Sequence, residues 1–315
     1  NKTAQGNTDA NGIGDFYYAP PSGYLALCTA NLPDPVIDPA QDDVPEDYFN
    51  TVLYNGNNSF LRSITGVGFQ PDFVWLKSRT DVLVHGLADV VRGATRHLYT
   101  NLTNAEIVDE VDGYLSLFDS DGFTLEAGTS SNATFNRSGD AYVSWNWKAD
   151  GAGVTNTDGT ITSTVSANQK SGFSVVSWTG DGVNNRTVGH GLSEAPQAII
   201  TKSRNVAQNW YVWTDALAAT TGLGLNTTDA AATFSYGTWG TKTSTTIEAV
   251  SGANGLANVN NSGTTYIAYC FHSVDGYSKF GSYVGNGSTD GPFVYTGFRP
   301  AFIMLKASTR DASWI

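Results

Sequence analysis

The acidic residues around position 120 are the densest group of potential metal ligands in this chain. Asp119-Ser-Asp-Gly122 is similar to the start of a calcium-binding loop, and Asp109, Glu110 and Asp112 lie near enough in sequence to supply further oxygens. Calcium takes roughly six to eight oxygen ligands, and the bidentate Glu that closes such a loop is missing at the expected spacing. Because Asp, Ser and Gly are also the residues of tight turns, we predict a hairpin turn here and no metal.

The four histidines do not form a catalytic or metal-binding pattern. His85, His97, His190 and His272 show no spacing typical of zinc ligands or of a catalytic triad. The sequence also lacks a Gly-x-Ser-x-Gly motif, a phosphate-binding loop and a dinucleotide fingerprint. A pair of acids for glycoside hydrolysis would meet only in the fold, but the acids here cluster in predicted turns and linkers. We therefore predict no catalytic residue, no cofactor and no enzymatic activity.

Three tryptophans are the best candidates for binding a ligand. Trp210, Trp213 and Trp239 would suit a glycan if their ring faces are exposed, because sugar rings stack on exposed aromatic side chains. On an extended strand Trp210, Val212 and Trp213 cannot all share one face, so one tryptophan is expected to point outward or into an interface. Packing in a core or between subunits is the competing interpretation, and it is the favoured one.

Composition restricts the chain to a few classes of protein. Of its 315 residues only 15% are charged, whereas 12% are aromatic and 34 are Gly, which is typical of a β-rich protein with many turns. The net charge of −12 argues against a nucleic-acid partner, which would need a basic surface. No apolar run is long enough for membrane insertion. The two cysteines, Cys28 and Cys270, are expected to be buried reduced thiols, with a disulfide as the alternative.

One sequence unit occurs three times and organises the chain. The copies lie at 69–79, 195–204 and 298–306. Each has a Pro that marks the start of a strand, then an apolar run that suits a strand buried on both faces, then a Lys. Pro71 and Pro196 are 125 residues apart, and so are Lys77 and Lys202. Chance matches would not share one offset, so we infer the duplication of a whole domain.

The segments between these units alternate short apolar runs with turns of Gly, Asn and Asp, which is typical of antiparallel strands. Strands are predicted over 14–18, 24–28, 49–54, 73–77, 114–118, 123–126, 142–148, 160–165, 173–178, 198–200, 210–213 and 266–272. One short helix is predicted over 83–92, although Gly86 interrupts it. In the strand that closes the first module, Val143, Trp145 and Trp147 share a face, which we expect to form the core of a sandwich.

The predicted fold is all-β, with tandem antiparallel β-sandwich (jelly-roll-like) modules. The predicted boundaries are the end of a preceding domain at 1–37, an acidic Pro-containing linker at 38–48, a first module at 49–150, its duplicate at 151–273 and the start of a third, truncated module at 274–315. We therefore expect this chain to be an internal piece of a longer polypeptide.

Several of these motifs resemble a known family. Ala-Pro-Pro-Ser-Gly-Tyr-Leu-Ala-Leu-Cys-Thr-Ala-Asn-Leu-Pro at 19–33 resembles the end of the SPRY or concanavalin-like module in virion proteins of tailed phages, especially marine ones. Gly-Phe-Gln-Pro-Asp-Phe-Val-Trp-Leu-Lys at 68–77 and Trp-Asn-Trp-Lys at 145–148 resemble the repeated module that follows it. Ser-Gly-Phe-Ser-Val-Val-Ser-Trp-Thr-Gly at 171–180 is similar to the same module in tail-fibre-like proteins. The second copy departs from the pattern, with Tyr-Cys-Phe-His at 269–272.

The resemblance implies a structural virion protein of a tailed bacteriophage, located at the surface of the particle. The expected role is a fibre or appendage for host attachment, with other virion proteins and a host surface glycan as partners. Assembly as a homo-oligomer, often a trimer, is expected by analogy alone. A capsid decoration protein and a carbohydrate-binding or glycan-degrading protein are the alternatives.

Overall fold

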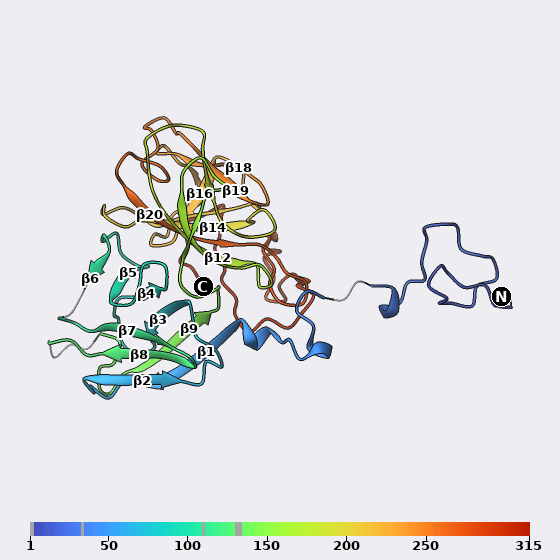
Figure 1. The fold of residues 1–315 in the computed structure, drawn as a ribbon, viewed down its shortest axis with the longest axis horizontal. Coiled ribbons are helices and arrows are strands. Elements are labelled where there is room, and N and C mark those ends of the chain that lie inside the picture. Colours follow the sequence, from blue (N-terminus) through green and yellow to red (C-terminus); the bar gives the residue numbers. More distant parts are fainter. Residues whose placement is uncertain (1–2, 33–34, 109–110, 130–133) are drawn as a thin grey trace.

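Antiparallel strands make up almost all of the regular structure. The computed structural model describes residues 3–32, 35–108, 111–129 and 134–315. That part of the chain contains twenty strands, three short 3₁₀ helices and no α-helix, so the all-β prediction is confirmed. The strands form two sandwiches (Figure 1), which we call the first sandwich (49–147) and the second sandwich (154–271).

The first sandwich pairs a six-stranded sheet with a three-stranded sheet. The strand order is β1-β9-β3-β4-β5-β6 in the large sheet and β2-β8-β7 in the small one, and each pairing is antiparallel. The strands are β1 (Phe49–Asn55), β2 (Leu61–Thr65), β3 (Phe73–Ser78), β4 (Gly86–Asp89), β5 (Arg96–Tyr99), β6 (Ile107–Val108), β7 (Tyr114–Asp119), β8 (Gly122–Glu126) and β9 (Ala141–Trp147).

The second sandwich pairs an eight-stranded sheet with a three-stranded sheet. The strand order is β10-β11-β12-β20-β14-β15-β16-β17 in the large sheet and β13-β19-β18 in the small one. The strands are β10 (Val154–Asn156), β11 (Ser163–Asn168), β12 (Phe173–Thr179), β13 (Arg186–Gly189), β14 (Ala198–Ser203), β15 (Tyr211–Thr214), β16 (Thr221–Gly224), β17 (Ala232–Thr233), β18 (Thr238–Lys242), β19 (Thr246–Val250) and β20 (Thr265–Phe271).

The two sandwiches share one topology once β10 and β11 are set aside. Strands β12, β20, β14, β15, β16 and β17 follow in the same order as β1, β9, β3, β4, β5 and β6. The repeated sequence units supply β3 and β14, which each pair with the strand that closes the sandwich. Stacked rings recur as well, with Tyr54 on Tyr142 in one sandwich and Trp178 on Tyr266 in the other. The sequence repeat is therefore also a repeat of topology.

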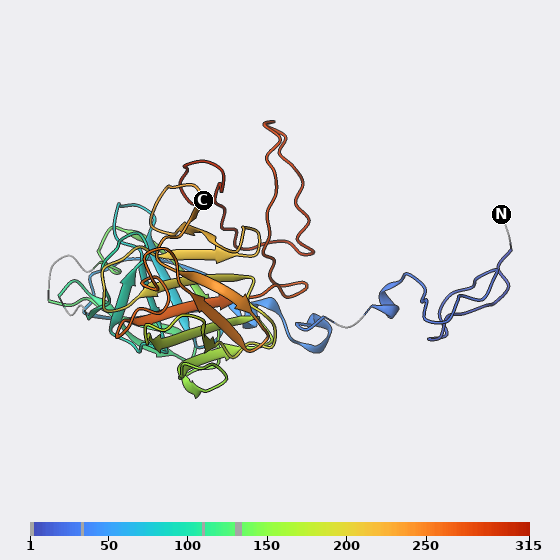
Figure 2. The same cartoon turned by 90° about the horizontal axis from the view of Figure 1, so that it is seen from above.

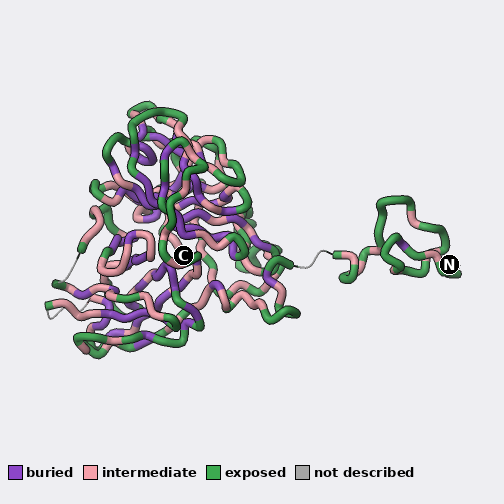
Figure 3. Tube along the Cα trace, viewed as in Figure 1, coloured by how far each residue is buried: buried purple, intermediate pink, exposed green. Residues whose placement is uncertain are grey.

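Three large apolar clusters form the buried layers of the two sandwiches, and Figure 3 shows the buried residues there. One lies inside the first sandwich around Tyr142, and another lies inside the second sandwich around Trp239. The third joins Phe73 of the first large sheet to Tyr269 of the second. The two large sheets thus face each other, as Figure 1 shows for β3 and β9 below β12 and β14, and we call the region between them the junction.

The closing strand β9 faces opposite to the prediction. Tyr142, Ser144 and Asn146 are fully buried, and Tyr142 belongs to the cluster inside the first sandwich. Trp147 instead packs into the junction cluster, and Trp145 on the same strand face contacts Phe302. The large aromatic face is needed because it covers the neighbouring sandwich, whereas the polar Ser144 and Asn146 bond to each other and to backbone within the core.

The helix predicted over 83–92 is wrong, because Gly86–Asp89 of this segment form strand β4 and its other residues form turns and loops. Leu87 and Ala88 alternate between the junction and the inside of the sandwich, as strand residues do. Gly86 starts the strand, and a Cβ placed on it would lie 2.2 Å from the ring of Phe135. The glycine that seemed to interrupt a helix is therefore required for the close approach of this ring to the strand.

The two strands predicted over 14–18 and 24–28 are also wrong. The described part of the N-terminal segment has one isolated bridge, between Asn7 and Phe16. The carboxylate of Asp9 organises this segment instead, since it accepts backbone hydrogen bonds from Asn11, Ile13 and Ala26. Such local bonds hold a loop rather than a ladder. Figure 1 shows this segment well away from the two sandwiches.

The linker and the C-terminal segment contain no strand. The 3₁₀ helices η1 (Thr29–Asn31), η2 (Pro39–Gln41) and η3 (Pro45–Asp47) lie ahead of β1. Ile37 and Tyr48, at the two ends of the linker, are buried against Val274 and Tyr277, so the linker packs on the start of the C-terminal segment. The third copy of the repeated unit, 298–306, lacks regular structure. Figure 2 shows the C-terminal residues as long loops beside the second sandwich.

Candidate functional site

The three candidate tryptophans are all buried. Trp210 is 0% exposed, Trp239 is 2% exposed and Trp213 is 4% exposed, so no ring face is open to a sugar at these positions. Trp213 and Trp239 pack together inside the second sandwich. Trp210 points into the junction, where its Nε1 donates to the backbone oxygen of Tyr99 at 2.9 Å. The packing interpretation agrees with these positions, and the structure does not bring the three side chains together at a surface.

A buried ion pair lies at the centre of the junction. Arg92 Nε donates to Asp89 Oδ2 at 2.6 Å, and both side chains are 0% exposed. Tyr269, on β20 of the second sandwich, donates its hydroxyl to the same carboxylate oxygen at 2.7 Å. Burial is the largest single influence and acts to lower the pKa of Arg92, but Asp89, Tyr269 and Glu106 together outweigh it and raise this pKa above its ordinary value. Arg92 therefore stays charged, and the hydrogen bond from Tyr269 to Asp89 links the two sandwiches.

A second acidic group binds both sandwiches from the side of the junction. Glu106 accepts two hydrogen bonds from Arg204, at 2.9 and 3.0 Å, and Arg96 contributes another at 2.9 Å. The backbone N–H of Glu106 also donates to the carbonyl of Arg204 at 2.6 Å. Burial alone would raise the pKa of Glu106, but Arg204, Arg92 and Arg96 lower it below its ordinary value. Such bidentate pairs between an arginine and a carboxylate fix the relative orientation of the two groups and also stabilise their contact.

The C-terminal segment also contacts the junction. Phe302 lies against Trp145 and Trp147, with ring centroids 5.8 and 5.6 Å apart. Trp314 packs on the junction cluster and donates its Nε1 to the carbonyl of Gly224 at 2.9 Å. The first sandwich, the second sandwich and the C-terminal segment therefore all contribute residues to the junction.

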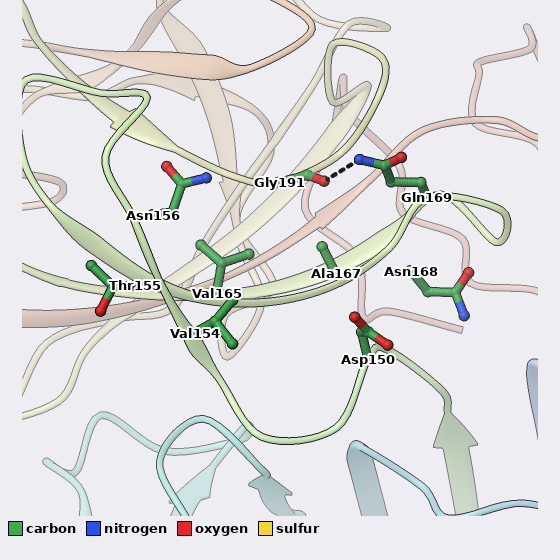
Figure 4. A pocket seen from close by; sticks show the side chains of 9 residues that line it. All are labelled: Asp150, Val154, Thr155, Asn156, Val165, Ala167, Asn168, Gln169 and Gly191. Carbon is green, nitrogen blue, oxygen red and sulfur yellow. Dashed lines mark hydrogen bonds between the residues drawn. The ribbon is translucent and has the colours of Figure 1, made fainter.

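One open pocket lies beside the hairpin of β10 and β11, which has no counterpart in the first sandwich (Figure 4). Its volume is about 450 Å³. The lining residues are Asp150, Val154, Thr155, Asn156, Val165, Ala167, Asn168, Gln169 and Gly191. Gly191 has a φ of +73°, and a Cβ there would lie 2.8 Å from Val165, so glycine keeps this wall close to β11.

The pocket is lined by both apolar and polar side chains. Val154, Val165 and Ala167 supply methyl groups, while Gln169 Nε2 donates to the carbonyl of Gly191 at 3.1 Å and leaves its oxygen for another donor. The exposed carboxylate of Asp150 has no hydrogen-bond or ion-pair partner in the described part of the chain. This arrangement can accept hydrogen bonds from hydroxyl or amino groups.

The acidic group near position 120 forms a turn, as predicted. Strands β7 and β8 pair from Asp119 to Gly122, and the hairpin turn lies between them. Asp121 accepts from the N–H groups of Gly66 and Gly68, and Asp119 accepts from the Thr124 hydroxyl. Of the other acids proposed as ligands, Asp109 and Glu110 lie outside the described residues.

The remaining ionisable groups do not gather into a centre. Among the described residues, no group of three or more His, Cys, Asp or Glu side chains could hold a metal ion. Both cysteines are free, as favoured, but only Cys270 is buried as predicted, because Cys28 lies half-buried in the loop-rich N-terminal segment. Burial raises the pKa of the Cys270 thiol to about 12. In the same part of the chain, no helix is long and apolar enough to cross a membrane.

The junction residues were not predicted from the sequence, although the sequence contains one pattern that points to Arg204. The first two repeated units both end in Lys-Ser-Arg, and Arg204 of the second unit is the arginine that holds Glu106. Nothing in the sequence pairs Asp89 with Tyr269, because 180 residues separate them. Asp150 and Gln169 were missed as well, since only the hairpin of β10 and β11 brings them to one pocket.

Fold and junction together define a tandem β-sandwich protein whose modules are fused through equivalent faces of their large sheets. A family model described as a domain of unknown function (DUF7483) matches residues 44–315, and the chain belongs to this family. The matched range spans both sandwiches and the C-terminal segment. Comparison with curated proteins and with solved structures gave no match.

Proposed function

We propose that this chain is a structural part of a tailed-phage virion, within a fibre or similar appendage that serves host attachment. Its role is mechanical, because it holds a surface at a fixed place on the particle and performs no chemistry. Its partners are other virion proteins, and its location is the particle surface. The proposal rests on the resemblance of the repeated module to virion proteins and on the way the two sandwiches are joined.

The fused junction is the observation that carries this proposal. Two domains on a flexible linker would move independently, whereas these share an apolar cluster, a buried ion pair and the two-pronged bond between Arg204 and Glu106. Interfaces between domains of one chain are usually more polar than obligate protein–protein interfaces, and they usually allow the domains to move relative to each other. An appendage needs such a stiff tandem unit to keep its attachment surface at a fixed distance from the particle.

Electron microscopy of intact particles at side-chain resolution tests the proposal. Density for the two sandwiches on a tail or fibre is the expected result. Density on the shell lattice would instead favour the alternative, a capsid decoration protein. Particles that contain no such density would remove the virion assignment altogether.

A carbohydrate-binding function is the second candidate, and the pocket beside β10 and β11 favours it. Asp150 and Gln169 offer acceptors for sugar hydroxyls beside the apolar side chains of the lining. Hydrolysis would need two facing carboxylates, and Asp150 is the one acid among the described lining residues. A glycan array followed by titration of the Asp150→Asn and Gln169→Ala variants tests this function. If both variants bind the glycan as tightly as the wild type does, the pocket is not the binding site.

A further inference from the structure

Strand β1 is an edge strand that differs from the other edge strands of the described sheets. Exposed sheet edges are usually protected by shortness, by a charged residue or by a bulge, because open backbone groups recruit other strands. Strands β6 and β17 have two residues each, and β10 has three. Strands β2 and β13 carry Arg62 and Arg186, and β7 and β18 are bulged.

None of these protections is built into the sequence of β1, although Arg62 on β2 donates to the carbonyl of Asn55 at the end of β1. Its seven residues, Phe-Asn-Thr-Val-Leu-Tyr-Asn, include no charged residue and no Pro. The pairing with β9 runs without a bulge over all seven positions. Leu53 is 59% exposed in spite of its apolar side chain. A long, regular and uncharged edge is the type of strand that accepts a partner.

The hydrogen-bond pattern shows which backbone groups are open. Tyr48 accepts from Lys148, and Gly56 donates to Asp140, so the even-numbered residues of β1 bond to β9. In an antiparallel pair the alternate residues point their N–H and C=O away. Thr51 and Leu53 therefore present two donors and two acceptors at the outer edge.

The second sandwich shows how this edge is covered elsewhere. Strand β12 is the counterpart of β1, and β11 pairs along its outer side from Asn168 to Ser163. The residues before β1 form η2 and η3, and the described part of the chain supplies no strand at this position. The same topology thus has a covered edge in one copy and an open edge in the other.

We propose that a second copy of this chain pairs with β1, through its own β1, across a two-fold axis at Val52. Thr51 of each copy then lies opposite Leu53 of the other, and four backbone hydrogen bonds join the two large sheets. An antiparallel strand is complementary to itself in this way, and β1 itself contains no charged residue that would oppose the pairing. The exposed side of Leu53 becomes covered. This inference rests on the sheet alone and stands apart from the virion assignment.

Sedimentation velocity of the whole chain over a concentration series tests the inference. The expected result is a monomer–dimer equilibrium in which Leu53→Lys raises the dissociation constant by about tenfold or more, because a charge at an edge opposes pairing. Leu117→Lys is the matched control, since Leu117 is 56% exposed on bulged β7, and it should leave the dimer unchanged. Thr51→Pro should also weaken the dimer while β9 pairing persists, because this N–H points outward.

Hydrogen exchange of the Thr51 and Leu53 amides separates the remaining outcomes. Both amides should exchange slowly in the dimer and rapidly after dilution to the monomer. Protection in the monomer would mean that another part of the same chain covers the edge, which overturns the inference. A dimer with rapid exchange at both amides, a trimer, or a monomer up to the solubility limit would overturn it as well.

Discussion

Lys202 is a buried cation held by backbone oxygens. Its side chain is 0% exposed, and Nζ donates to the carbonyls of Ser203 and Val206 at 2.9 and 3.3 Å. Among the described residues, no carboxylate forms an ion pair with it. Burial lowers the pKa of Lys202 to about 8. A charge that is desolvated without a counter-ion opposes folding, so this side chain has a measurable cost.

Lys202→Met should stabilise the protein by about 2 kcal/mol at pH 7, because it removes this buried charge and keeps the side-chain volume. Between about pH 8 and 10.4 the unfolded chain retains the proton that folded Lys202 has lost, so wild-type stability should rise with pH in this window. The variant should lack that rise. Urea unfolding at pH 7 and 9.5 measures both effects.

Lys77→Met is the control, because Lys77 is the matching lysine of the first sandwich and is only half-buried. We expect it to change stability little. A loss of stability in Lys202→Met would show that the two carbonyl bonds outweigh the cost of burial.

His190 is expected to make the free energy of unfolding depend on pH under mildly acidic conditions. It is fully buried, its Nε2 donates to the carbonyl of Thr243 at 3.1 Å, and its Nδ1 accepts from the N–H of Leu192 at 3.2 Å. A proton on Nδ1 would oppose this second bond. Burial is the main cause that lowers the pKa of His190 below its ordinary value.

The unfolded chain therefore binds a proton near pH 6.5 that folded His190 does not, and stability should fall as the pH drops below about 6.5. The maximum slope for one proton is about 1.4 kcal/mol per pH unit. Denaturation midpoints between pH 7.5 and 5 measure this slope, and His190→Gln should reduce it. An equal slope in the variant would assign the effect to other groups, among them His85, whose pKa burial lowers to about 4.

At the scale of elements, strand β4 shows how a single contact decides secondary structure. Gly86 lies under the buried ring of Phe135, where a Cβ would come within 2.2 Å. Its backbone pairs with Leu76 on β3 and with Tyr99 on β5, so the strand has little room to move away. The small residue is therefore required by packing on one face and by hydrogen bonds on both sides.

Gly86→Ala should destabilise the first sandwich by about 1–3 kcal/mol, because the ring or the strand must shift in a packed core. Gly281→Ala is a suitable control, since no atom lies within 4 Å of a Cβ there and the change should stay within about 0.5 kcal/mol. Thermal unfolding of both variants checks the difference. Equal melting temperatures would mean that Phe135 moves aside freely.

At the scale of the whole molecule, the contacts in the junction couple the two sandwiches, so that they are expected to unfold together. Glu106 of the first sandwich is held by Arg204 of the second and by Arg92 and Arg96 of its own. Its side chain is only 9% exposed, so these charges are shielded from solvent. The loss of one partner from such a group leaves charges buried without compensation.

Glu106→Gln should reduce the free energy of unfolding by about 3 kcal/mol, and it should separate the unfolding of the two sandwiches. Calorimetry should show one transition for the wild type and two, or a broadened one, for the variant. The low pKa of Glu106 also means that its contribution is present above about pH 4.3 and is lost as the pH falls further.

Glu126→Gln is the matched control, because Glu126 on β8 forms no ion pair within the described residues and lies away from the junction. It should leave both the stability and the shape of the transition unchanged. A single sharp transition in Glu106→Gln would show that the apolar cluster couples the sandwiches without the charges.

The class of fold and the duplication can both be predicted from the amino-acid sequence. Alternation of apolar and polar residues, together with turns such as the one at 119–122, locates half of the strands, because both signals are local. The common offset of Pro71 with Pro196 and of Lys77 with Lys202 shows that one domain was copied. These features depend on chain periodicity and turn chemistry, which do not require knowledge of what a strand packs against.

Tertiary structure alone decided which face of each strand meets which partner. Trp147 faces the second sandwich, and Trp210 is buried at the junction rather than exposed to a ligand. Period-2 patterning divides a strand into two faces but does not say whether a face meets a core, a neighbouring domain or solvent. Contacts such as that of Tyr269 with Asp89 join residues 180 positions apart, and they arise only when the two large sheets pack together.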